Sequence, residues 1–189
     1  MKKPNNYETT QAQGTFEPLK LGGHVCKIIK LEETKSSTGK DMLKIAIDIA
    51  EGEQAGYFKN QFDNDNRSEK KWSNGGMVYV MVEDKEGNCN QAFKTLCDSV
   101  EKSNGGFAIK WGEDFAAQFK GKLIGGVFGR EEYKNNNNEL KFATKCRYFC
   151  TVDRARKGIE APKDKLLQGV LHDRDMTPTN TEEEDDMPF

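Results

Sequence analysis

Apolar residues recur at two different periods along the chain, and these periods predict where strands and helices lie. Over residues 43–49, Leu and Ile alternate with Lys, Ala and Asp, a period of two that is typical of a half-buried strand. The β-rich run 24–33 precedes this strand, and the turn-forming run 34–40 joins the two into a predicted hairpin. Further strands are expected over 57–62 and 77–82.

Residues 88–104 follow a helical period instead. Phe93, Leu96, Cys97 and Val100 lie three or four residues apart, so they predict one apolar face of a helix. The two glycines that come next end this helix.

The last regular segment is a predicted hairpin with strands over 123–133 and 140–152. Its connection, 134–139, contains four consecutive asparagines, and asparagine tolerates the left-handed backbone that tight turns need. Three glycines within the first of these strands predict a bulge or sharp curvature there.

The predicted order is therefore strand, strand, one or two more strands, helix, strand, strand. This order favours a mainly β fold: an OB-fold-like antiparallel barrel of five or six strands with one helix before the last hairpin. A generic α+β sheet is the alternative. We divide the chain into a flexible arm (1–20), the OB-fold-like domain (21–153), a linker (154–180) and a disordered acidic tail (181–189).

Length and composition agree with one domain plus polar tails. The chain has 189 residues, of which 35% are hydrophobic and 32% charged, and this length suits a single core of ordinary size. No apolar run is long enough to span a membrane, and the sequence begins with polar residues rather than a secretory signal. We therefore expect a cytoplasmic protein.

The formal net charge of −2 is unevenly distributed. Residues 159–189 contain nine acidic and three basic residues, which leaves 26 basic and 22 acidic residues, a net charge of +4, in 1–158. A mildly basic body with an acidic tail suits a polyanionic ligand better than the total charge suggests.

Metal and catalytic sites are not expected. The five cysteines are an odd number and include no C-x₂-C pair, so buried, reduced thiols are favoured over zinc ligands. The two histidines are far apart in the sequence. The carboxylate pairs Glu131/Glu132 and Asp63/Asp65 could serve a metal-dependent nuclease, but surface charge is the more common role of such residues. We expect no cofactor and no enzymatic activity.

The final predicted strand has two faces of different character. Lys141, Lys145, Arg147 and Phe149 lie at alternate positions on one face, and apolar residues fill the other. Cationic side chains contact phosphates, and an aromatic ring offers a stacking surface to any base. This face is a candidate site for a single strand of nucleic acid; a solvated strand face is the alternative.

Two neighbouring segments could extend that face. In the preceding strand, Phe128 and Arg130 are two residues apart and share a side. Trp72 follows two lysines in a polar loop, so we expect it to be exposed and able to stack on a base.

The C-terminus combines charge with an apolar ending. Five consecutive acidic residues precede Met187, Pro188 and Phe189. A solubilising acidic tail would explain the acids but not the apolar ending. A docking peptide would explain both, because Phe189 can fill an apolar pocket while the acids approach a basic rim.

The ending Asp185-Asp186-Met187-Pro188-Phe189 resembles the acidic tip of bacterial and phage single-stranded DNA-binding proteins. The resemblance implies an OB-fold body that wraps single-stranded DNA and a tip that recruits replication, recombination and repair proteins. The segments 35–43 and 129–133 are similar to those of the small members that phages and prophages carry, which implies a bacterial host cytoplasm.

The sequence therefore predicts a non-enzymatic protein that coats single-stranded DNA largely without sequence preference and that could be a homo-oligomer. The alternatives are an OB-fold adaptor that binds protein or RNA and, less favoured, a metal-dependent nuclease.

Overall fold

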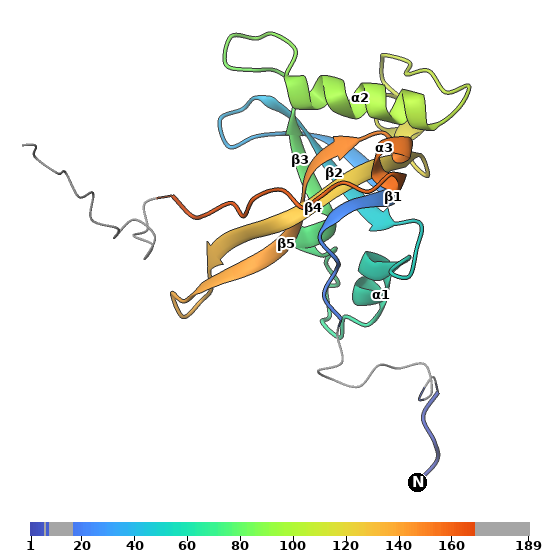
Figure 1. Ribbon diagram of the computed structural model, residues 1–189, viewed down its shortest axis with the longest axis vertical. Coiled ribbons are helices and arrows are strands. Elements are labelled where there is room, and N and C mark those ends of the chain that lie inside the picture. Colours follow the sequence, from blue (N-terminus) through green and yellow to red (C-terminus); the bar gives the residue numbers. More distant parts are fainter. Residues whose placement is uncertain (6, 8–16, 169–189) are drawn as a thin grey trace, which may run out of the picture.

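The computed structural model describes residues 1–5, 7 and 17–168 as a mainly β fold (Figure 1). Along the chain the elements are β1 (Gly22–Lys35), β2 (Asp41–Ile49), α1 (Tyr57–Asp63), the 3₁₀ turn η1 (Asn74–Gly76), β3 (Met77–Met81), α2 (Gln91–Ser103), the 3₁₀ turn η2 (Ala117–Phe119), β4 (Leu123–Lys134), β5 (Leu140–Cys150) and α3 (Val152–Arg156). No helix within the described ranges is long and apolar enough to cross a membrane.

The five strands form one antiparallel sheet in the order β3-β2-β1-β4-β5. This confirms a mainly β fold with a helix, α2, before the last hairpin. Figure 1 shows α2 lying across one end of the sheet, with α1 near the opposite end. Because the first strand pairs with both the second and the fourth, it lies at the centre of the sheet.

The predicted strand over 57–62 is wrong, because this segment is helix α1. Gly56 precedes it with a φ of 77°, in the left-handed region that glycine adopts readily. The Asp48 carboxylate then accepts hydrogen bonds from the backbone N–H groups of Phe58 and Lys59, at 2.9 and 3.4 Å. Two of the aromatic residues of this run, Phe58 and Phe62, are four residues apart, which is a helical period.

The main core lies between the sheet and α2. Ile28, Ile45 and Ile47 from the first two strands are fully buried. The predicted face of α2 is confirmed, since its four apolar residues are all in this core. The Asn90 side chain caps α2 by accepting a hydrogen bond from the Ala92 N–H at 2.9 Å.

A bulge in β5 reverses the orientation of side chains along the last strand. Val127 pairs with Tyr148, and the next residue, Phe128, pairs with Cys146, so Arg147 is the extra residue. Beyond it, Phe149 enters the same core as Cys146, although the two are three residues apart. The glycines of β4 predicted a bulge in this hairpin, but it lies in the partner strand.

The folded part of the chain continues past the boundary predicted at 153. That boundary lies inside α3, after which the chain returns along β4. Lys165 accepts a hydrogen bond from the Glu132 N–H at 2.8 Å and donates one to the Arg130 carbonyl at 3.0 Å. In the predicted N-terminal arm, Leu19 is buried in the core.

Replacing Phe128 with alanine tests this core. The side chain is completely buried, so Phe128→Ala should lower the free energy of unfolding by about 3–5 kcal/mol. Urea denaturation measures the loss. Phe142→Ala is the matched control, because Phe142 lies on the adjacent strand and is 45% exposed; it should cost below about 1 kcal/mol. Equal losses for the two variants would contradict the assignment of Phe128 to the core.

Candidate nucleic-acid interface

The two phenylalanines predicted to stack on bases are core residues. Phe128 is 0% exposed and Phe149 is 4% exposed. The Phe128 ring stacks against Phe58, with centroids 6.0 Å apart, and meets the edge of His24 at 5.5 Å. The bulge at Arg147 turns Phe149 inward, and Phe128 lies in the same core. The prediction that these two rings face a ligand is therefore wrong.

The predicted arginine ligands both make hydrogen bonds within the protein. The Arg130 guanidinium donates two hydrogen bonds to the Asp164 carboxylate, at 2.9 and 2.6 Å, and this pairing raises the pKa of Arg130. Arg147 donates to the Arg130 carbonyl at 3.2 Å. Asp164 comes from the segment after α3, which the sequence assigned to a linker.

The two predicted lysine ligands are also next to acids. Lys145 lies 3.3 Å from the Glu131 carboxylate, which Lys165 also contacts at 2.8 Å. Lys165 and Lys145 lower the pKa of Glu131. Lys141 lies 3.2 Å from Glu139. The β4–β5 hairpin therefore carries cations, as predicted, but Lys141 and Lys145 each have a carboxylate beside them.

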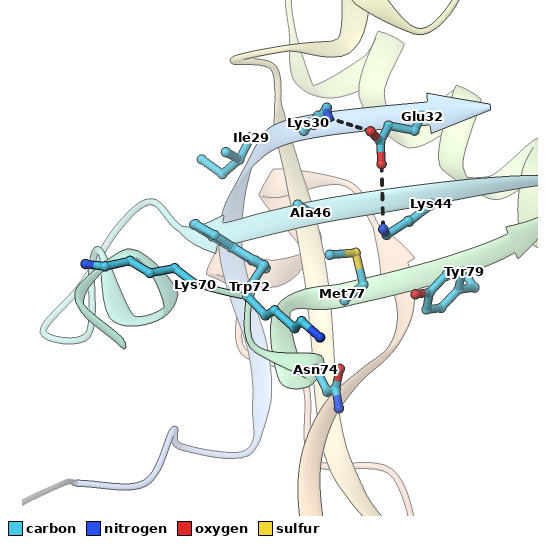
Figure 2. Close-up of a pocket in the computed structure, with 11 residues that line it drawn as sticks. Ile29, Lys30, Glu32, Lys44, Ala46, Lys70, Trp72, Asn74, Met77 and Tyr79 are labelled. Atoms are coloured by element: carbon cyan, nitrogen blue, oxygen red, sulfur yellow. Dashed lines mark ion pairs between the residues drawn. The ribbon is translucent and has the colours of Figure 1, made fainter. Parts of the chain in front are cut away.

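A more basic surface lies on the outward face of β1, β2 and β3 (Figure 2). The pairing register places side chains from the three strands side by side in two rows. These rows are Lys30–Ala46–Met77 and Glu32–Lys44–Tyr79. Period-two alternation directs Ile45, which lies between the two rows, into the core, and it does the same for Val80, the residue after Tyr79.

The loop before β3 converts this face into an open groove of about 530 Å³, which we call the lysine groove. Its lining residues include four lysines but one carboxylate, Glu32. Glu32 pairs with Lys30 and lies 3.7 Å from Lys44. Lys71 has no ion pair with a described residue. The lysine groove is lined by Ile29, Lys30, Glu32, Lys44, Ala46, Lys70, Lys71, Trp72, Asn74, Met77 and Tyr79.

Trp72 lines the lysine groove but is half-buried rather than exposed as predicted. Its indole N–H donates to the Ile47 carbonyl at 3.1 Å, and its ring lies 5.6 Å from Phe62. These contacts hold the indole in a defined position beside Ala46 (Figure 2). The orientation of Trp72 is therefore set before any ligand arrives.

Tyr79 is the aromatic residue that the sequence interpretation missed. It is 57% exposed and lines both the lysine groove and a second hollow between β3 and β5. Arg147, Tyr148 and Arg154 also line that hollow. An apolar run such as 77–82 is typical of a buried strand, whereas its pairing with Lys44 places Tyr79 on the outer side.

The loop that carries Trp72 is shaped by an acidic side chain. Asp65 accepts hydrogen bonds from the Arg67 backbone N–H at 3.0 Å and from two guanidinium nitrogens of Arg67 at 2.9 and 2.7 Å. The Arg67 guanidinium holds the pKa of Asp65 well below its usual range. Lys70 and Lys71, two of the four lysines that line the groove, follow shortly after this turn.

The carboxylates considered for a nuclease site make hydrogen bonds or ion pairs within the protein. Asp63 pairs with Lys59 at 2.6 Å, and Glu132 accepts a hydrogen bond from the Leu167 N–H at 3.0 Å. Over the described ranges, no group of three or more His, Cys, Asp or Glu residues could hold a metal ion. All five cysteines are free, and burial raises the pKa of Cys146 to about 12.

The C-terminal tip, Asp185–Phe189, lies outside the described residues. Comparison of the sequence with protein-family models gives no match, and comparison with curated proteins gives none either.

Asp65→Asn should loosen the loop beside Trp72. Because the pKa of Asp65 is lowered in the folded chain, its stabilising effect is present above about pH 4, the unfolded value, and is lost as pH falls below it. In a Trp111→Phe background, which leaves Trp72 as the single tryptophan, the Asn variant should show stronger acrylamide quenching at pH 7. Without the Asp65→Asn change, quenching of Trp72 should stay constant from pH 5 to 8. Identical quenching with and without this change would contradict the role of Asp65 in ordering the loop.

Proposed function

We propose that the protein binds single-stranded DNA, largely without sequence preference, and that it does so without catalysis. The lysine groove is the observation that supports this most. It brings four lysines together with the rings of Trp72 and Tyr79 on one open face of the sheet. Lysines neutralise phosphates and aromatic rings stack on bases of any identity, which is the combination that non-specific single-strand binding requires.

We further propose that the sheet is a partly open OB-type barrel. The strand order and the position of α2 between β3 and β4 support this proposal. The two ends of the sheet also approach each other, because a Cβ atom on Gly75 would lie 2.7 Å from the Thr144 carbonyl oxygen of β5. In this fold the face of the second and third strands binds oligonucleotides, and that is where the lysine groove lies.

Tyr79 would be the centre of the DNA path. It borders both the lysine groove and the hollow that Arg147, Tyr148 and Arg154 line, so a strand leaving the groove would reach further cations and another ring. Lys141, Lys145 and Arg130 would act as secondary phosphate ligands, since they would have to exchange their present acidic partners for phosphates.

Tyr79→Ala should weaken binding of a fluorescein-labelled thymidine oligonucleotide. Loss of one stacking interaction corresponds to about 1–3 kcal/mol, or roughly 5- to 150-fold in Kd. Fluorescence anisotropy at several salt concentrations provides the measurement, and the affinity of the parent protein should fall steeply as salt rises. Absence of binding even at low salt would exclude the proposed function.

Matched variants separate the two candidate faces. Tyr133→Ala, which removes an exposed ring from the β4–β5 hairpin, should leave Kd unchanged. The double variant Lys44→Ala/Lys71→Ala should reduce the salt dependence of DNA affinity more than the double variant Lys141→Ala/Lys145→Ala does. The reverse order would place the main interface on the hairpin. Preference for an RNA competitor, or cleavage that requires magnesium, would favour the adaptor or nuclease alternative.

We also propose that the tip Asp185–Phe189 recruits replication, recombination or repair proteins. The support is the sequence resemblance of this ending. Deletion of 187–189 should abolish binding to such partners in a pull-down with a panel of purified bacterial proteins. The same deletion should leave DNA affinity unchanged or slightly higher, because the three deleted residues have no cationic side chain that could contact a phosphate. Loss of DNA binding on this deletion would contradict the assigned role.

A further inference from the structure

Trp111 is a large aromatic side chain that the proposed DNA site does not use. It is 71% exposed, the largest exposed fraction of any described aromatic residue. Its ring stacks on Phe115, with centroids 5.2 Å apart and an interplanar angle of 15°, and lies 6.2 Å from Phe93 of α2. An exposed indole that packs on buried aromatic rings is typical of a binding surface.

The backbone around Trp111 is held from two sides. Gln118 accepts a hydrogen bond from the Lys110 N–H at 2.8 Å and donates one to the Lys110 carbonyl at 2.7 Å. Glu101, on α2, accepts a hydrogen bond from the Ile109 N–H at 2.8 Å. The loop is therefore ordered before binding, which lowers the entropic cost of docking a partner.

Two hollows flank the Trp111 ring, and together with it they form what we call the Trp111 surface. One, of about 230 Å³, lies toward the β1–β2 hairpin and includes Met42, Val82 and Phe115. The other, of about 290 Å³, lies along α2 and includes Cys97 and Ile109. Each is large enough to take one or two apolar side chains, so the surface can anchor a short peptide.

The charges around the Trp111 surface are acidic. The lining of the two hollows includes four carboxylates and one lysine. The carboxylates are those of Glu33, Asp41, Asp98 and Glu101. The one lysine, Lys94, pairs with Asp98, while Lys35 nearby pairs with Asp41 at 2.6 Å. This is the reverse of the lysine groove, which has four lysines and one carboxylate.

Charge complementarity decides what can occupy this surface. A DNA strand would bring phosphates against carboxylates, and the chain's own acidic ending would meet the same repulsion. A basic peptide would not: an apolar side chain can enter a hollow, Lys or Arg can meet the carboxylates, and an Arg can lie on the indole face.

We propose that the Trp111 surface docks a basic peptide segment of a partner protein, anchored by one bulky apolar side chain beside Trp111. This interaction is independent of DNA binding, since it uses none of the residues of the lysine groove.

The test uses the full-length protein and three synthetic 12-residue peptides, each with a central Leu-Trp pair. The flanking residues are Arg and Lys in the basic peptide, Ser in the neutral peptide and Glu in the acidic peptide. Isothermal titration calorimetry should detect binding of the basic peptide alone. Trp111→Ala should weaken that binding about 10-fold or more, Glu33→Gln/Asp98→Asn should also weaken it, and Tyr79→Ala is the matched control that should not.

Two further measurements keep the result unambiguous. The indole N–H resonance of Trp111 should shift on titration with the basic peptide while that of Trp72 does not, which tests the parent protein without any substitution. A chain lacking 182–189 should bind the basic peptide as the parent does. Equal binding of the basic and neutral peptides, an unshifted Trp111 resonance, or binding that survives Trp111→Ala but disappears with residues 182–189 would overturn the proposal.

Discussion

The buried carboxylate of Asp48 is the constraint on which the candidate interface depends. Only 5% of this residue is exposed, and a buried carboxylate is tolerated when hydrogen-bond donors surround it. Here those donors are the backbone N–H groups of Ile49, Phe58 and Lys59, at 2.9, 2.9 and 3.4 Å. The start of α1 is thereby fixed against β2.

That anchor determines where β3 and the groove lie. It places the Phe58 ring against Gly75 and Gly76, where an added Cβ atom would lie 3.1 and 2.8 Å from ring carbons. Glycine at both positions lets the backbone pass close over the ring, where no larger residue would fit. The chain then enters β3 in the register that sets Tyr79 beside Lys44. A buried charge on one strand thus positions an exposed aromatic residue on the next.

The β1–β2 hairpin also separates the two kinds of charge. The pair Glu32↔Lys44 faces the lysine groove, whereas the next pair along, Glu33↔Leu43, faces the hollow beside Trp111. Since successive residues of a strand point to opposite sides, one hairpin contributes to a basic surface and to an acidic one. The net charge of −2 is therefore the sum of contributions from surfaces of opposite sign.

Local patterns in the sequence predicted the first hairpin and α2, where periodicity extends over several residues without interruption. They failed where a single residue changed the geometry. The bulge at Arg147 reversed the orientation of Phe149, and no local signal gives the position of a bulge in the partner strand. Arg130 was correctly placed on β4, but Asp164, its partner, lies 34 residues away. The periodicity of apolar residues gives no information about ion pairs between residues so far apart in the sequence.

The return of the chain along β4 affects how the molecule can be divided. Without the segment around Lys165, the backbone N–H of Glu132 and the carbonyl of Arg130 would lose their present partners. Such groups on an open strand edge recruit other strands, which leads to aggregation. A version of the chain ending at the sequence-predicted boundary of 153 would expose this edge, so the smallest well-behaved unit extends at least to Leu167.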